Sequence, residues 1–106
     1  MTVKRAIQLY AQEVAEHVGI IRDALNETPP DTVTAKEWLG ELKRMQKVWQ
    51  AEYERRAAQK PIIPPGHWKS AKERDAIKAR HQDFVDDAIN RTRITTDAIA
   101  EAQALF

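Results

Sequence analysis

The sequence predicts an all-α protein, an antiparallel three-helix bundle that is extended in one version by a short fourth helix at the C-terminus. Apolar residues recur at steps of three and four over long stretches, and no stretch alternates apolar and polar residues as a strand does. All five prolines fall in two clusters, at positions 29–30 and 61–65. Because proline breaks a helix, these clusters divide the chain into three helical segments. At 106 residues the segments make a single domain, 1–106.

The first helix is predicted over residues 3–26. Thr2 is a suitable N-cap because its hydroxyl can accept a hydrogen bond from a backbone N–H of the first turn. One apolar stripe follows the whole segment, which predicts a single buried face. Its members are Val3, Ile7, Tyr10, Val14, Val18, Ile21 and Leu25.

The second helix is predicted over residues 34–59. Thr34 and Glu37 have the spacing of a capping box, and Val33 and Trp38 flank it as a hydrophobic staple would. Gly40 lies inside this helix at a cost of about 1 kcal/mol relative to alanine. The predicted buried stripe consists of Trp38, Leu42, Met45, Trp49 and Tyr53.

The connector "KPIIPPGHWK", residues 60–69, joins the second and third helices and has two interpretations. In the first, its apolar groups fold back over the open end of the core, and Trp68 is buried there. In the second, Trp68 stays exposed among basic residues and anchors a binding partner, as tryptophan does at many interfaces. We expect the connector to be a turn first and an interaction surface second.

The third helix is predicted over residues 71–105, and Ser70 with Glu73 forms a second capping-box spacing. An unbroken helix of this length spans roughly 52 Å, whereas the other two span roughly 36–39 Å. Threonines near residues 92–96 are poor helix formers, so a break there with a short fourth helix is the alternative to a continuous, overhanging helix. The continuous version favours a dimer. Its apolar positions are Ile77, Phe84, Ala88 or Ile89, Ile99, Ala102 and Phe106.

Charge is unevenly distributed along the chain. Residues 34–60 carry seven basic and four acidic side chains and residues 61–81 carry five and two, whereas both terminal segments are net acidic. If the second and third helices are antiparallel, these basic residues gather at the end of the bundle that holds the connector. The residues predicted to bind a partner are Arg55, Arg56, Lys60, His67, Trp68, Lys69 and Lys72.

A basic end with a tryptophan favours three functions. The first is a protein-interaction module, an adaptor, inhibitor or regulator, that docks on a larger protein with an acidic or mixed surface. The second is a nucleic-acid-binding protein that neutralises phosphates with the same end. The third is a homodimer or other homo-oligomer through the C-terminal helix, which would bury Ile94, Ile99, Leu105 and Phe106 between chains. The alternative to all three is a solvated face with intrahelical pairs such as Glu52 with Arg56 and Lys69 with Glu73.

Catalysis is not predicted. The chain has no cysteine, and its three histidines lack metal-ligand spacing. Carboxylates one turn apart, Glu13 with Glu16 and Asp83 with Asp86 or Asp87, are too few for a magnesium site. We therefore expect no enzyme, no cofactor and no metal.

The chain also lacks the features of a membrane or secreted protein. No apolar run approaches the roughly 20 residues of a membrane span, and the N-terminal stretch carries charges where a secretory signal is apolar. A cytoplasmic protein is expected, of the small single-domain kind typical of bacterial or phage accessory proteins.

Overall fold

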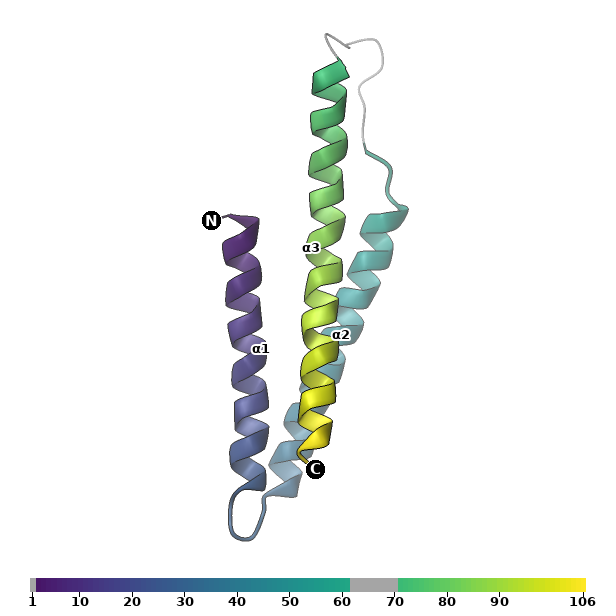
Figure 1. Cartoon of the computed structure of the whole chain (residues 1–106). Helices are drawn as coiled ribbons and strands as arrows, with labels where there is room; N and C mark the ends of the chain where they lie inside the picture. Colours follow the sequence, from purple (N-terminus) through teal and green to yellow (C-terminus); the bar gives the residue numbers. More distant parts are fainter. Residues whose placement is uncertain (1, 62–70) are drawn as a thin grey trace.

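Three helices make up the computed structural model, which describes residues 2–61 and 71–106 (Figure 1). They are α1 (Val3–Leu25), α2 (Thr32–Ala58) and α3 (Ala71–Ala104). Successive helices run antiparallel, and each helix packs against both others. The predicted all-α three-helix bundle is confirmed, and each predicted helix end lies within two residues of the observed one.

α1 begins as the sequence predicts. The Thr2 hydroxyl accepts a hydrogen bond from the backbone N–H of Arg5 at 3.1 Å. Its apolar stripe faces the core from Tyr10 onward, but Val3 is 57% exposed at the free end of the helix. The buried residues of α1 are Tyr10, Val14, Val18, Ile21 and Ala24.

α2 begins two residues earlier than predicted, and the capping box of Thr34 and Glu37 is wrong. Asp31 is the N-cap, and its Oδ1 accepts a hydrogen bond from the Thr34 N–H at 3.0 Å. The Asp31 N–H donates to the Ala24 carbonyl at 2.9 Å, which fixes Asp31 at the end of the α1–α2 turn. Hydrogen bonding from Thr34 lowers the pKa of the Asp31 carboxyl. The predicted staple is wrong as well, because Val33 is 67% exposed.

α3 is continuous, so the alternative with a break near 92–96 and a fourth helix is wrong. The threonines that suggested a break are accommodated in two ways. Each of three hydroxyls donates to the carbonyl oxygen four residues earlier, at 2.7–2.9 Å, and two of the three side chains are buried in the bundle. These hydroxyls belong to Thr92, Thr95 and Thr96.

The bundle is long and thin, with principal extents of 68 × 23 × 17 Å and a Cα radius of gyration of 18.8 Å. A compact chain of this length has a radius of gyration of about 13 Å. The core is built from one stripe of each helix. Its buried members are Tyr10, Val14, Val18, Ile21, Ala24, Ala35, Leu42, Ala98, Ile99 and Ala102.

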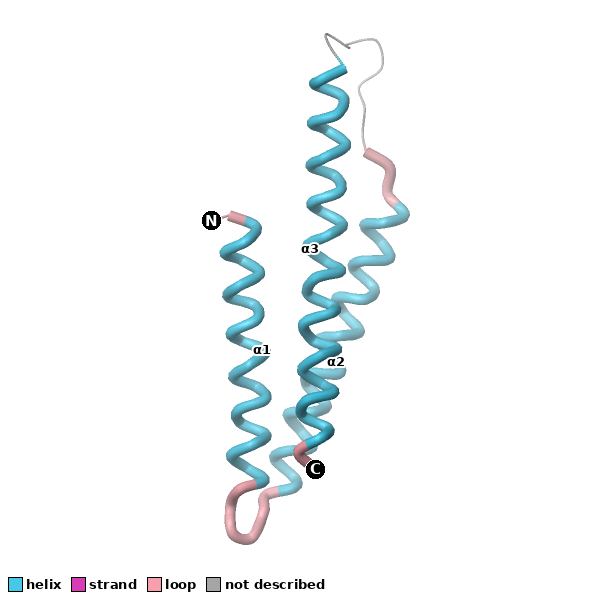
Figure 2. Tube along the Cα trace, viewed as in Figure 1, coloured by secondary structure: helices cyan, strands magenta, loops and turns pink. Residues whose placement is uncertain are grey.

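α3 extends farther than either other helix at the end opposite the α1–α2 turn. Its 34 residues span about 51 Å, whereas the 23 residues of α1 span about 35 Å. Figure 2 shows the first turns of α3 rising beyond the start of α1 and the end of α2. Among residues 71–83 every side chain is exposed except Ile77 and His81, which are half-buried. Two residues predicted to face the core, Phe84 and Phe106, are 40% and 51% exposed.

Candidate partner-binding end

The end that holds the connector is strongly basic. Within residues 55–61 and 71–84, called the basic end below, seven side chains are basic and three are acidic. The basic side chains of residues 55–61 lie at or just after the end of α2, and those of residues 71–84 lie at the start of α3. Because the two helices are antiparallel, both groups lie at the same end of the bundle (Figure 1). The basic middle of the sequence is therefore one end of the folded molecule.

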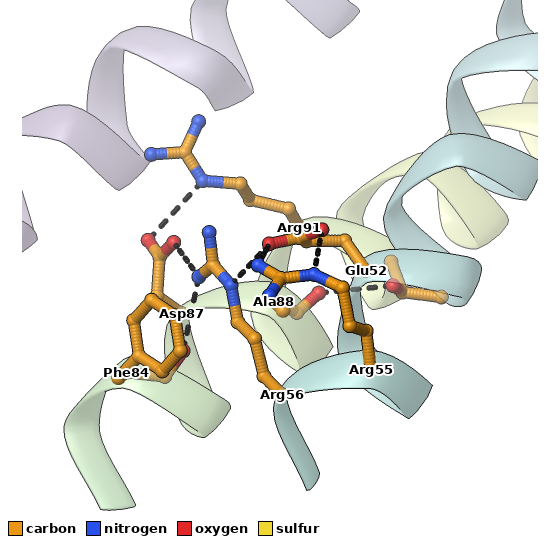
Figure 3. A network of polar contacts seen from close by, with 8 residues as sticks. Glu52, Arg55, Arg56, Phe84, Asp87, Ala88 and Arg91 are labelled. Atoms are coloured by element: carbon orange, nitrogen blue, oxygen red, sulfur yellow. Dashed lines mark hydrogen bonds and ion pairs between the residues drawn. The ribbon is translucent and has the colours of Figure 1, made fainter. Parts of the chain in front are cut away.

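A network of ion pairs joins α2 to α3 at the base of this end (Figure 3). Asp87 accepts hydrogen bonds from two arginines, from Arg56 Nη1 at 3.0 Å and from Arg91 Nε at 3.1 Å. Arg56 also donates through Nε to Glu52 at 2.8 Å and through Nη1 to the Phe84 carbonyl at 3.0 Å. The side chains of Arg56, Asp87 and Arg91 are only 14–18% exposed. These charges are thus largely withdrawn from solvent and matched within the chain.

Aromatic rings and the same two guanidinium groups alternate across the three helices. The Arg56 guanidinium lies 4.1 Å from the centre of the Phe84 ring and 5.7 Å from that of Trp49. The Arg91 guanidinium lies 4.6 Å from the Trp49 ring and 5.2 Å from the Tyr10 ring. Such contacts are attractive because the ring face is electron-rich. They connect α3 through α2 to α1, which indicates that Arg56 and Arg91 hold the bundle together.

Glu52 is held by two neighbouring arginines of α2. Arg55 Nε donates to it at 3.0 Å and its Nη2 contacts the second carboxylate oxygen, while Arg56 adds a third hydrogen bond. Hydrogen bonds from Arg55 first and Arg56 second lower the pKa of Glu52 to about 2. The predicted Glu52–Arg56 pair is confirmed, and Glu52 is found to pair with Arg55 as well.

The predicted partner-binding residues fall into three groups. Arg56 is half-buried and belongs to the ion-pair network. Arg55, Lys60 and Lys72 are exposed, although Arg55 is also paired with Glu52. The other three lie outside the described residues, and so do both interpretations of Trp68 as a buried or an exposed side chain; they are His67, Trp68 and Lys69.

An open groove lies where α1 begins beside α3. It has a volume of about 460 Å³, and Val3 and Phe84 contribute exposed apolar surface to it. The sequence interpretation assigned both residues to the buried stripe and missed this groove. The signal that could have revealed it is the difference in predicted helix length, since a shorter α1 must leave part of α3 uncovered. The remaining lining residues are Thr2, Ala6, Arg56, Arg80, Asp83, Asp87 and Arg91.

His17 has a packing role away from the basic end. His17 lies edge-on to Trp38 with ring centres 4.9 Å apart, and its Nδ1 donates to the Glu13 carbonyl at 2.7 Å. Within residues 2–61 and 71–106, no three or more histidine, aspartate or glutamate side chains gather as a metal site would require. None of the described helices has the length and apolar character needed to cross a membrane.

Comparison with known proteins finds no protein family, no curated protein and no solved structure that matches this chain. Function therefore has to be inferred from the geometry and charge of the molecule.

Proposed function

We propose that this protein is a non-catalytic interaction module of the cytoplasm that docks on a larger protein through its basic end. The observation that carries the proposal is the position of that end. The first turns of α3 project past both other helices, are exposed, and belong to a region with seven basic and three acidic side chains. A projecting charged helix can reach a complementary acidic surface without rearrangement of the core.

Within the described residues, Arg55, Lys60 and Lys72 are the cations proposed to contact the partner. His67, Trp68 and Lys69, which lie outside those residues, complete the proposed surface. Arg56 is proposed to act indirectly, because its charge is already matched by Glu52 and Asp87. Its part is to keep α2 and α3 in place beneath the contact surface.

Nucleic acid is the second candidate partner, because the same cations would suit a phosphate backbone. A homo-oligomer through the C-terminal helix has less support. Ile99 is 9% exposed within the core of its own chain, and Ile94 packs against that core. Only Leu105 and Phe106, at 36% and 51% exposure, remain for contacts between chains.

The direct test is a pull-down of the tagged protein from bacterial lysate, with half of the sample treated with nuclease. The proposal predicts a discrete protein band that survives nuclease treatment. Recovery of nucleic acid, with the accompanying proteins lost after nuclease, would contradict it and assign the basic end to phosphate binding. A solution mass of one chain at micromolar concentration would exclude the homo-oligomer.

A further inference from the structure

The groove beside α1 continues along the first turns of α3, which α1 does not cover. α1 covers one side of α3 only up to the level of Asp83 and Phe84, where Thr2 and Val3 border the groove. Beyond that level about 12 residues of α3, roughly 18 Å, have neither of the other two described helices on this side (Figures 1 and 2). A partner helix lying there would continue the line of α1.

The groove offers apolar contact at its floor. Phe84 is 40% exposed and its ring is held by the Arg56 guanidinium at 4.1 Å, so its position is fixed before a partner arrives. Val3, 57% exposed, faces the same groove from α1. An amphipathic helix would bury both side chains, and apolar burial is worth about 25 cal/mol per Å².

The charge around the groove indicates which charge a partner helix should carry. Arg56 and Arg91 are already paired with Asp87, but no ion pair within the described residues involves Arg80, which lines the groove. The first turn of α1 carries Lys4 and Arg5 and no acidic residue. The lining itself holds three arginines, Arg56, Arg80 and Arg91, and two aspartates, Asp83 and Asp87, whereas Lys4 and Arg5 lie outside the lining on the adjoining turn of α1. The balance favours a partner with carboxylates on the flanks of its apolar face.

We infer that the groove binds an acidic amphipathic helix of the partner protein, packed on Phe84 and Val3 and facing Arg80. This inference rests on the proposed docking function and adds the chemistry and the position of the docked segment. A second copy of this chain is a poorer occupant, because the acidic half of α3 already buries its apolar face in its own core.

The test is a titration of the ¹⁵N-labelled protein, followed by NMR, with two synthetic amphipathic peptides of about 14 residues. Both carry leucines on one helical face; one has glutamates and the other lysines on the flanks. We expect the glutamate peptide to shift the amide signals of Val3, Arg80 and Phe84. We expect the lysine peptide to bind at least about tenfold more weakly.

Two variants and two matched controls locate the site. Phe84→Ala is expected to weaken binding of the glutamate peptide by about tenfold, and Arg80→Glu by about fivefold or more. Arg80→Glu changes an exposed side chain, so its effect does not depend on the Phe84–Arg56 contact. Arg93→Glu on α3 and Phe106→Ala just beyond its end make the same changes at exposed positions away from the groove and should leave the affinity unchanged.

Three outcomes would overturn the inference: no binding of either peptide, equal binding of both, or self-association that the two groove variants abolish. Signal shifts confined to Lys60 and Lys72 would also overturn it. In that case the docking function would stand and only the groove would be excluded. If the peptide result holds but the pull-down recovers only nucleic acid, the docking function fails instead.

Discussion

At the scale of single residues, the Asp87 carboxylate lies at the centre of the contacts that join the helices. This carboxylate joins Arg56 of α2 to Arg91 of α3, and through the Arg91 stack it supports the position of Tyr10 in α1. The side chains of Asp87 and its two arginine partners are only 14–18% exposed. Removal of the carboxylate would therefore leave two positive charges in a poorly solvated site.

Replacing Asp87 should therefore destabilise the fold. Asp87→Ala is expected to lower the free energy of unfolding by about 2–3 kcal/mol, because two partly buried guanidinium groups lose their shared partner. Urea unfolding followed by circular dichroism measures this. Asp86→Ala, at the exposed neighbouring position, is the matched control and should cost no more than about 0.5 kcal/mol. Equal losses in the two variants would show that the Asp87 network contributes nothing specific.

Tyr10 and Thr95 form the buried hydrogen bond that ties α1 to α3. Thr95 uses its hydroxyl hydrogen on the Arg91 carbonyl at 2.7 Å, so Tyr10 must donate to Thr95 Oγ1 across 2.8 Å. Burial is the main cause that raises the pKa of the Tyr10 hydroxyl above its usual 10.0. The unfolded chain therefore loses this proton at a lower pH than the folded chain does.

Stability should consequently fall as the pH rises from 10.0 through the raised pKa of Tyr10. Near neutral pH, Tyr10→Phe is expected to cost about 1 kcal/mol, because one hydrogen bond is lost while the Thr95 hydroxyl stays satisfied. Above pH 10.0 the difference between the two proteins should shrink, since phenylalanine has no proton to lose. Urea unfolding of both proteins across this pH range measures the effect. A difference that stays constant or grows would contradict the assignment.

At the scale of elements, the helices could be predicted because proline clusters and apolar periodicity both act locally. The predictions that were wrong concern features that depend on contacts between helices. The α2 cap is Asp31 because its N–H bonds Ala24 in α1, which no pattern within α2 reveals. The threonines of α3 lower local helix propensity, but burial of Thr92 and Thr95 in the bundle outweighs that preference.

Gly40 allows a direct test of local helix propensity in α2. A methyl group added there would meet no atom within 4 Å, so alanine can be accommodated without strain. Gly40→Ala is expected to raise the free energy of unfolding by about 0.5–1 kcal/mol, because alanine loses less backbone entropy than glycine on folding. Thermal or urea unfolding provides the measurement. Ala51→Gly, at another exposed position of the same helix, should lower it by a similar amount, and a loss of stability in both variants would be inconsistent with this account.

At the scale of the whole molecule, the separation of charge could be predicted, because it follows from composition along the chain and an antiparallel turn. The different roles of neighbouring basic residues at the basic end could not be predicted. Arg55 and Arg56 are adjacent and chemically identical, yet Arg56 meets Asp87, 31 positions away, while the Arg55 side chain remains 54% exposed. Such a distinction depends on which side of α2 faces α3. The groove likewise arises only from the different lengths of α1 and α3 in the folded bundle.

The central claim is that the basic end binds a protein partner, and charge reversal at that end tests it most directly. The variant Arg55→Glu/Lys60→Glu/Lys72→Glu is compared with Lys36→Glu/Lys43→Glu/Arg93→Glu, which makes the same charge change at exposed positions elsewhere. Recovery of the nuclease-resistant partner band from lysate is measured for both variants and for the unmodified chain. We expect the band to be lost with the first variant and retained with the second. Equal retention by both variants, or equal loss, would contradict the claim, because binding would then depend on overall charge or on another surface.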